Sequence, residues 1–314
     1  MRKRSWILIM ISMLLIFITA CNKENMEPEA LVEQEIKIAI ENAELSGTLL
    51  EADNEKALAI IVPGSGPTDR NGNSAVGLNT DAYKKLDMGL KENGISSFRY
   101  DKRGVGQSKA GFEGKEAESD YDDVINDLVK IIEHFEGKNI WLIGHSEGST
   151  VSIIAAQKTE VQKVISLAGP GENIADIINW QIRENKANPP EIIEACDKII
   201  EKLKNGEMVD EIPDYLMALF RPSVQPYLIS WMKYEPAEEI AKLKCEVVVI
   251  QGDADIQVTI ANAEKLGEAS GVTPKILKGM NHVLVEVDGQ QEQVESYSHP
   301  ELPLHPELIN SIVE

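Results

Sequence analysis

Short apolar runs of strand length recur along the chain, and segments with helical spacing separate most of them. The runs are rich in Ile, Val and Leu and lie at residues 36–40, 45–50, 57–62, 95–100, 140–143, 161–167, 247–250 and 274–277. The first two follow each other closely, which predicts an antiparallel pair. The later runs alternate with helical segments, which is typical of a parallel sheet with helices on both faces. We therefore predict an α/β protein with a mostly parallel central sheet.

One long segment breaks this alternation. Residues 171–238 contain no convincing strand pattern, and prolines divide the segment into short helices. We predict a helical cap at 171–238, inserted after the sixth strand of a core formed by residues 36–170 and 239–314. The apolar positions of the segment are expected to form the core of the cap, with an acyl-binding pocket as the alternative. One set of them has helical spacing: Ile192, Ile193, Cys196, Ile199, Ile200 and Leu203.

The start of the chain has the pattern of a signal peptide. Basic residues at positions 2–4 precede an apolar run of about 13 residues, which is short for a membrane-spanning helix. The run ends in Ile-Thr-Ala before Cys21, which resembles the bacterial lipobox, in which the cysteine is lipidated and begins the mature protein. We therefore expect a lipoprotein signal peptide at residues 1–20, lipidation at Cys21 and a polar tether at 21–35. An ordinary signal peptide or an uncleaved anchor is the alternative.

Charge and cysteine content indicate which partners the domain can bind and whether it contains a disulfide. The net charge of −21 becomes −24 when the three basic residues of the signal peptide are removed. So acidic a domain is a poor partner for nucleic acid or for anionic lipid surfaces, which leaves membrane attachment to the lipid. After Cys21 only Cys196 and Cys245 remain. Because Cys245 opens an apolar strand, we expect it to be a core residue rather than half of a disulfide.

The corner after the strand at 140–143 carries the first candidate for chemistry. It reads Gly144-His145-Ser146-Glu147-Gly148, and an apolar helix follows directly. So tight a corner strains its central residue and leaves room only for glycine two positions to either side. The free N–H groups at the start of the helix would stabilise negative charge near Ser146. The pattern favours Ser146 as a nucleophile over an incidental serine in a glycine turn.

A serine nucleophile requires a base and an acid that orients the base. His282 lies directly after the last strand, where a base is expected. Asp253 and Asp255 both follow the strand at 247–250, and the order Ser, Asp, His along the chain is the order expected on such a sheet. Position alone does not separate the two aspartates. The other histidines lie inside the corner, on an earlier helix or in the tail: His145, His134, His299 and His305.

The chain resembles the α/β-hydrolases, and within them the bacterial carboxylesterases of the serine-aminopeptidase-like branch. The resemblance covers residue 36 to the C-terminus and implies the α/β-hydrolase fold with an inserted cap. It also implies that the protein hydrolyses small or short-chain carboxylic esters through an acyl-enzyme. Five stretches carry the resemblance: PGSGPTDRNGN at 63–73, YDKRGVGQS at 100–108, the serine corner, GDAD at 252–255 and Asn281-His282.

The resemblance also implies particular site residues. In that family the acid follows the glycine by three residues, which selects Asp255 over Asp253. The loop that begins at Pro63 would carry the oxyanion hole, with the backbone N–H groups of Ser65 and Glu147 as donors. Many relatives have histidine where this chain has Pro63, but because the donor is a backbone group one residue further on in the loop, the chemistry is retained.

The same stretches contain four charged residues outside the proposed catalytic set. We expect Asp101 and Arg103 to brace neighbouring loops rather than to touch substrate. The roles of Asp69 and Arg70 stay open.

Two functions other than carboxylesterase remain as alternatives. A serine aminopeptidase or amidase would need a carboxylate cluster to hold a free amine, and Glu147 beside the nucleophile keeps this possibility open. A non-catalytic solute-binding lipoprotein is the alternative of another class. The chain has neither a G-x-x-x-x-G-K-[ST] phosphate loop nor an H-E-x-x-H zinc helix, so we expect no nucleotide or metal cofactor. The oligomeric state stays open.

Overall fold

The computed structural model describes residues 32–41 and 43–314. The expected signal peptide at 1–20, the lipidation site Cys21 and the part of the expected tether up to residue 31 lie outside the described residues. Among those that are described, no helix combines the length and the apolar character needed to cross a bilayer.

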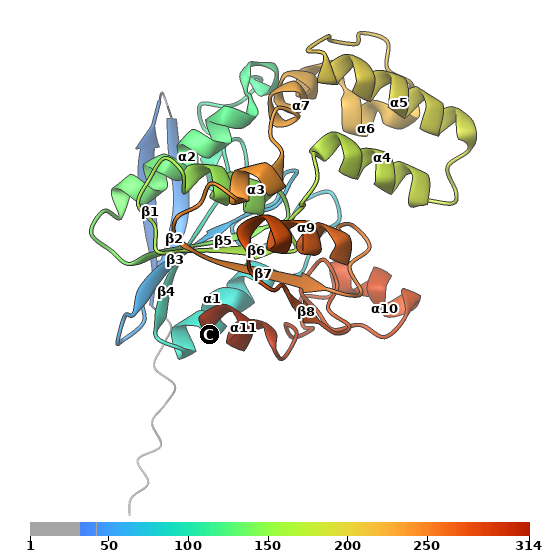
Figure 1. The fold of residues 1–314 in the computed structure, drawn as a ribbon. Helices are drawn as coiled ribbons and strands as arrows, with labels where there is room; N and C mark the ends of the chain where they lie inside the picture. The colour runs from blue at the N-terminus through green and yellow to red at the C-terminus, as the bar shows by residue number, and fades with distance from the viewer. Residues whose placement is uncertain (1–31, 42) are drawn as a thin grey trace, which may run out of the picture. The chain divides into compact units, whose positions relative to one another are not determined.

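Eight strands form one sheet in the order β1-β2-β4-β3-β5-β6-β7-β8 (Figure 1). β1 pairs antiparallel with β2 and β2 antiparallel with β4, whereas the remaining neighbours are parallel. The predicted antiparallel lead-in and the mostly parallel sheet are confirmed. The strands are β1 (Glu33–Ile40), β2 (Ala43–Leu50), β3 (Ala57–Val62), β4 (Ile95–Tyr100), β5 (Ile140–His145), β6 (Lys163–Leu167), β7 (Glu246–Gly252) and β8 (Lys275–Leu277).

The first strand begins three residues earlier than the sequence pattern predicted. Residues 33–35, which were expected to belong to the tether, pair with the end of β2. Their charged side chains face two buried arginines: Glu35 lies 2.7 Å from an Arg70 nitrogen, and Glu33 lies 2.7 Å from an Arg99 nitrogen. A charged run resembles a linker in a hydrophobicity pattern, and neither its pairing with β2 nor its long-range ion pairs give a hydrophobic signal.

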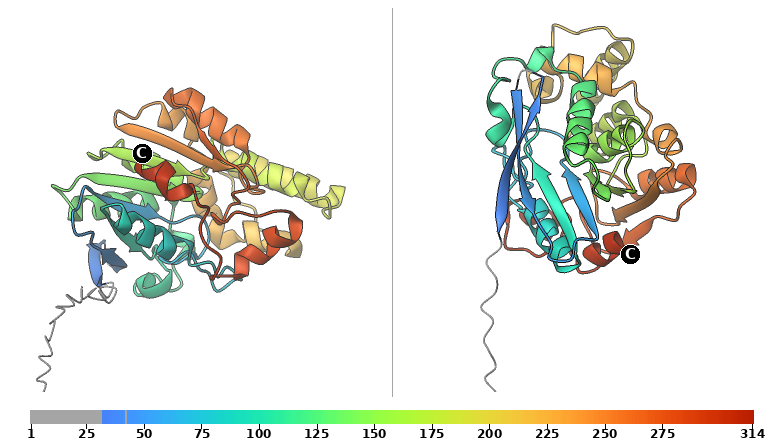
Figure 2. Two further views of the ribbon diagram at one scale, coloured as in Figure 1. Left: turned by 90° about the horizontal axis from the view of Figure 1, so that it is seen from below. Right: turned by 90° about the vertical axis from the view of Figure 1, so that its left-hand side faces the viewer.

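Helices cover both faces of the sheet (Figures 1 and 2). α1 (Ala82–Glu92) and α11 (Leu308–Val313) pack on one face, and α2 (Tyr121–His134), α3 (Glu147–Ala155) and α9 (Ile260–Ser270) pack on the other. Along β3 the side chains alternate between the two cores, and all six are buried. Burial on both faces explains why these strands are continuous apolar runs. Shorter helical elements are η1 (Gly106–Lys109), η2 (Glu116–Glu118), α10 (Gln290–Glu295) and η5 (Ser296–Ser298).

The chain between β6 and β7 is helical, and most of it extends away from the sheet at the upper right of Figure 1. On its long helix α5, Cys196 and Leu203 are fully buried, so the apolar stripe forms the interior of this segment. Cys196 and Cys245 are both free thiols. The segment consists of α4 (Ile174–Glu184), α5 (Pro190–Lys204), η3 (Asp214–Leu216), α6 (Met217–Phe220), η4 (Pro222–Val224), α7 (Gln225–Trp231) and α8 (Pro236–Ile240).

Candidate active site

Ser146 is the single residue between β5 and α3, and its backbone is strained. Its φ of 54° and ψ of −122° lie outside the regions that non-glycine residues prefer. A Cβ on Gly144 would overlap the Gly148 carbonyl group, and a Cβ on Gly148 would overlap the carbonyl oxygen of Val62 in β3. Only glycine therefore fits at these two positions. The corner holds the half-buried Ser146 side chain at the carboxyl ends of the parallel strands, where such sheets bind ligands.

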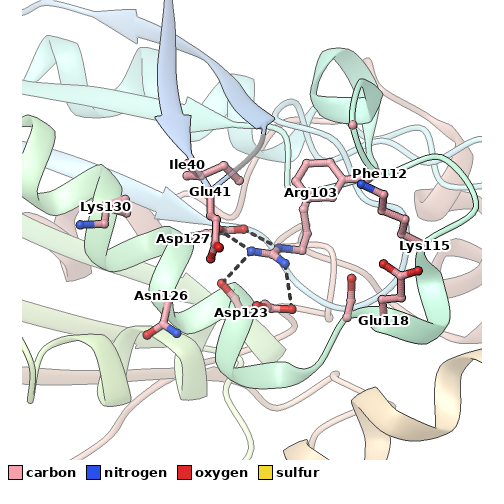
Figure 3. A pocket seen from close by; sticks show the side chains of 12 residues that line it. Ile40, Glu41, Arg103, Phe112, Lys115, Glu118, Asp123, Asn126, Asp127 and Lys130 are labelled. Carbon is pink, nitrogen blue, oxygen red and sulfur yellow. Dashed lines mark hydrogen bonds and ion pairs between the residues drawn. The ribbon is translucent and has the colours of Figure 1, made fainter.

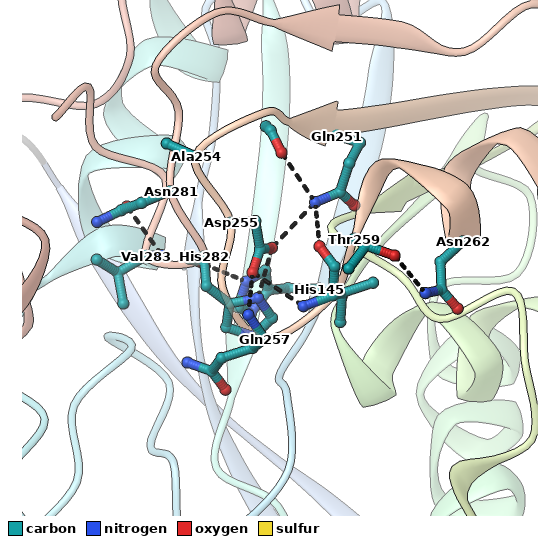
Figure 4. Close-up of polar contacts among 12 residues, drawn as sticks. His145, Gln251, Ala254, Asp255, Gln257, Thr259, Asn262, Asn281, His282 and Val283 are labelled. Atoms are coloured by element: carbon teal, nitrogen blue, oxygen red, sulfur yellow. Dashed lines mark hydrogen bonds and ion pairs between the residues drawn. The ribbon is translucent and has the colours of Figure 1, made fainter. Parts of the chain in front are cut away.

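His282 and Asp255 come from the loops that follow β8 and β7, and they meet in a buried pair (Figure 4). His282 Nδ1 lies 2.8 Å from Asp255 Oδ2. Gln251 Nε2 donates to the same oxygen at 3.0 Å, and the backbone N–H groups of Gln257 and Val258 donate to Oδ1 at 2.7 and 3.0 Å. Burial alone would raise the pKa of Asp255, but attraction to His282 and these hydrogen bonds outweigh burial and lower it.

The ionised Asp255 carboxylate determines the tautomer of His282. A carboxylate only accepts hydrogen bonds, so Nδ1 of His282 carries a proton and donates it. Nε2 is then the basic nitrogen of the neutral ring. This is the form that can remove a proton from a hydroxyl group.

Asp253 has a different role from Asp255. Its side chain is exposed, and its Oδ1 accepts a hydrogen bond from the backbone N–H of Gly279 at 2.5 Å. This bond joins the loop after β7 to the loop that carries His282. Of the two aspartates left open by position alone, the structure brings only Asp255 to the histidine.

His145 belongs to a buried chain of hydrogen bonds that sequence reasoning missed. Its Nε2 lies 2.8 Å from the His282 carbonyl oxygen, and its Nδ1 lies 2.8 Å from the Tyr83 hydroxyl group. A carbonyl oxygen only accepts, so Nε2 donates and Nδ1 accepts the Tyr83 proton. The Tyr83 oxygen in turn accepts the N–H of Gly64 at 3.0 Å. Burial, together with the nearby His282, lowers the pKa of His145 to about 3, so the ring is neutral.

These hydrogen bonds join the corner that carries Ser146 to the loop at Gly64 and to the loop at His282. Tyr83 lies 62 residues before His145, and His282 lies 137 residues after it. No local pattern connects three residues so far apart, and a histidine inside a glycine corner gives no signal by itself. The contacts position the backbone of His282 and the loop at Gly64.

The loop after β3 passes directly beside the nucleophile. A Cβ placed on Gly64 would lie 3.2 Å from Ser146 Cβ and 3.3 Å from His145 Nδ1. Ser65 follows in this loop, and Glu147 is the first residue of α3. Within the described residues, neither the Ser65 N–H nor the Glu147 N–H donates to a loop or side-chain acceptor. Both therefore remain candidate donors for an oxyanion.

The Glu147 side chain is buried and already has partners. It accepts a hydrogen bond from the Tyr227 hydroxyl group of α7, and one of its oxygens lies 3.6 Å from Lys102 Nζ. The carboxylate is thus compensated by a cation of the protein and joined to the helical segment. These contacts reduce its capacity to hold a charged group of a ligand.

Asp69 and Arg70, whose roles the sequence left open, have structural contacts. Asp69 Oδ1 accepts the backbone N–H groups of Asn71 and Asn73 at 2.8 and 3.0 Å. The Arg70 guanidinium donates to Asp101 at 2.9 and 3.1 Å, and both side chains are buried. These contacts shape the glycine-rich loop after β3.

A cavity lies away from these residues, around Arg103 (Figure 3). It has a volume of about 500 Å³, and Ser146, Asp255 and His282 do not line it. Arg103 is paired with Asp127 at 2.7 Å and with Asp123 at 2.9 Å, as expected of a bracing residue.

Among residues 32–41 and 43–314, no three acidic, histidine or cysteine side chains are arranged to hold a metal ion.

The chain is similar to a protein family and to a curated esterase. A family model described as serine aminopeptidase, S33, matches residues 76–209, which include Ser146 and Glu147 but end before Asp255 and His282. Esterase EstD from Thermotoga maritima is 25% identical over 275 residues. That match covers 86% of this chain, and the chain spans 64% of the length of EstD.

Solved structures share the fold. Est1E from Butyrivibrio proteoclasticus, with ferulic acid bound, matches with a TM-score of 0.57 at 17% identity, over 89% of this chain and 100% of that chain. Proline iminopeptidase from Mycobacterium smegmatis matches with a TM-score of 0.56 at 12% identity, over 80% of this chain and 92% of that chain. With the strand order and the helices on both faces, these similarities show that the chain has the α/β-hydrolase fold.

Proposed function

We propose that the protein is a serine hydrolase that cleaves small or short-chain carboxylic esters through an acyl-enzyme. The observations that carry this proposal are the strained Ser146 at a strand-to-helix corner and the buried His282–Asp255 pair. The backbone of His282 accepts a hydrogen bond from His145, the residue before Ser146. A non-glycine residue in such a conformation costs about 1–3 kcal/mol, which a turn without function has no reason to retain. Similarity to proteins named esterases supports the choice of ester substrates.

The proposed mechanism assigns one task to each group. Ser146 Oγ attacks the ester carbonyl carbon while His282 Nε2 takes the hydroxyl proton. Asp255 stabilises the imidazolium that forms. The N–H groups of Ser65 and Glu147 stabilise the negative oxygen of the tetrahedral intermediate.

The acyl-enzyme then forms and breaks down. The intermediate collapses, the ester C–O bond breaks, and the alcohol leaves with the proton from His282. Water repeats the sequence on the acyl-enzyme: His282 removes a proton from water, the hydroxyl attacks the acyl carbon, and Ser146 leaves with that proton as the carboxylic acid is released. No step of this sequence requires a cofactor.

A serine aminopeptidase or amidase is the second candidate. The description of the matching family model and the similarity to a proline iminopeptidase favour it. The contacts of Glu147 with Tyr227 and Lys102 weigh against it, because they occupy the carboxylate that would hold a substrate amine. A non-catalytic solute-binding protein has the least support, because strain at Ser146 has no purpose there.

We further propose that the mature protein is an extracytoplasmic lipoprotein of the bacterial cell membrane, anchored by an acyl chain such as palmitate on Cys21. The basic and apolar start of the chain and the Ile-Thr-Ala-Cys ending support this proposal. The hydrolase would then act on small esters at the membrane surface.

One pair of measurements tests the activity. A fluorophosphonate probe should label the wild-type protein and should fail to label Ser146→Ala. A panel of p-nitrophenyl esters and aminoacyl amides should give faster turnover with the esters. Absence of labelling would exclude a serine hydrolase, whereas labelling with preferred turnover of aminoacyl amides would support the second candidate.

A further inference from the structure

Lys102 lies between the two segments that carry the candidate oxyanion donors. Its Nζ donates to the Gly64 carbonyl oxygen at 2.5 Å and lies 3.6 Å from a carboxylate oxygen of Glu147. The side chains of Lys102 and Glu147 are only 8% and 2% exposed. Burial of an ammonium group is costly unless its partners compensate, so these contacts fix where the Lys102 charge sits.

The contact with Gly64 bears directly on Ser65. The Gly64 C=O and the Ser65 N–H belong to one peptide group, which is planar and trans, so the two bonds point in opposite directions. Holding the carbonyl oxygen therefore fixes the direction of the N–H. The preceding peptide is held as well, because the Gly64 N–H donates to the Tyr83 hydroxyl group at 3.0 Å.

The contact with Glu147 acts on the other donor. Glu147 is the first residue of α3, so its N–H has no acceptor within the helix. Its side chain is held on one side by Lys102 and on the other by Tyr227. One cation thus connects the peptide before Ser65 to the residue after Ser146.

We propose that Lys102 is a positioning residue that aligns both oxyanion donors and polarises the Gly64–Ser65 peptide. A cation at the carbonyl oxygen strengthens the N–H of the same peptide as a donor, because linked hydrogen bonds polarise one another. The inference rests on the proposed function, since it concerns the oxyanion of that reaction. Negative charge develops on this oxygen only in the transition state, so Lys102 affects kcat and leaves KM nearly unchanged.

A simpler role for Lys102 is to neutralise the buried Glu147 carboxylate. The two roles differ in a double variant. Lys102→Met leaves an unpaired buried carboxylate, whereas Lys102→Met with Glu147→Gln removes both charges and keeps a hydrogen-bonding side chain beside Tyr227. If neutralisation is the whole role, the double variant recovers kcat. On our proposal it does not, because the Gly64 carbonyl still lacks its donor.

A matched control is available in β6. Lys163 is also buried, pairs with Glu246 at 2.8 Å and lies over the Trp141 ring. It is the first residue of β6, whereas Ser146 follows the last residue of the adjacent, parallel β5. Lys163→Met therefore removes a buried, paired ammonium at the opposite end of the sheet from the site, and it should keep the wild-type kcat and KM.

The experiment measures kcat and KM for p-nitrophenyl butyrate and the inhibition constant of an alkyl trifluoromethyl ketone, which forms an oxyanion adduct with a serine nucleophile. Loss of a whole oxyanion donor lowers kcat by about 10²–10³-fold, so misalignment in Lys102→Met should lower it by about 10–100-fold. The same factor should weaken inhibition by the ketone, and KM should change by less than about twofold. The double variant should retain both losses.

Three results would overturn the inference: an unchanged kcat in Lys102→Met, a loss that appears only in KM, or recovery of kcat in the double variant. If Lys102→Met does not fold, the double variant alone decides, because its charges are balanced and its kcat should still be about 10–100-fold low. Absence of hydrolysis and of fluorophosphonate labelling in the wild type would instead refute the proposed function.

Discussion

Replacement of Asp255 by asparagine tests the candidate triad most directly. The variant keeps Oδ1, which accepts the N–H groups of Gln257 and Val258. The amide nitrogen then takes the place of Oδ2, which accepts from His282 Nδ1 at 2.8 Å and from Gln251 Nε2 at 3.0 Å. An amide nitrogen donates and does not accept, so it favours the His282 tautomer whose Nδ1 is unprotonated. That tautomer carries its proton on Nε2 and cannot take one from Ser146.

The expected size of the effect follows from these contacts. The wrong tautomer should lower turnover by about 10³–10⁴-fold, which corresponds to about 4–5.5 kcal/mol of transition-state stabilisation. The Gln251 amide loses a buried acceptor, which should lower the free energy of unfolding by about 1–3 kcal/mol. Asp253→Asn is the matched control, because this exposed side chain keeps the oxygen that accepts the Gly279 N–H.

The assay is turnover of p-nitrophenyl butyrate together with the melting temperature of each variant. Asp253→Asn should lose less than about tenfold in turnover and about 1 kcal/mol of stability. A dead Asp253→Asn beside a nearly normal Asp255→Asn would refute the reasoning, and so would an Asp255→Asn that retains more than about one tenth of the wild-type turnover.

Three further predictions concern other parts of the chain. Ser146→Ala and His282→Ala should each lower ester turnover by up to about a millionfold, and the double variant should be little worse. If the two losses instead multiply in the double variant, the residues do not act as one catalytic unit. The folded pKa of His145, about 3, lies below its ordinary 6.5, so the unfolded chain binds a proton that the folded chain does not. Stability is therefore retained above pH 6.5 and should fall by about 1.4 kcal/mol per pH unit as pH falls toward 3. The free energy of unfolding, measured with urea at pH 7, 6 and 5, should depend less on pH in His145→Gln than in the wild type. The control His134→Gln should keep the pH dependence of the wild type. An equal pH dependence in both variants would refute the role of His145. Cys21→Ser should abolish metabolic palmitate labelling and leave esterase activity intact, and unchanged labelling would reject the anchor.

The arrangement of the sheet was predictable because its strands are buried on both faces. β3 is apolar throughout and β5 begins with four apolar residues, and such runs are typical of strands buried on both faces. The start of β1 was not predictable. Glu33 and Glu35 carry no hydrophobic signal, and their partners Arg99 and Arg70 lie 66 and 35 residues away.

In the candidate site, too, some residues were predictable from a local sequence pattern and others were not. Ser146 has a local signal, because a glycine two residues to either side of a serine is typical of a tight strand-to-helix corner. Only part of the steric cause is local: a Cβ at Gly144 would overlap Gly148, whereas a Cβ at Gly148 would overlap Val62 in β3. Asp255 and Asp253 are equivalent in their position after β7, and the choice of Asp255 from the sequence rested on the family resemblance. The contacts made by the loop after β8 distinguish them directly, because His282 meets Asp255 whereas Gly279 meets Asp253. The contacts of Lys102 and Tyr83 with Gly64 have no local signal, since they join residues that are 38 and 19 positions apart in the sequence.

The two edges of the sheet bear on how the protein behaves at high concentration. An exposed strand edge is a template on which another chain can add a strand and begin aggregation. At one edge, β1 alternates charged residues with apolar ones and is tied down by the ion pairs of Glu33 and Glu35. At the other edge, β8 is only three residues long. Neither edge offers a long, flat, apolar strand, so the folded domain resists edge-to-edge association, and aggregation of a variant would require prior opening of the inner strands.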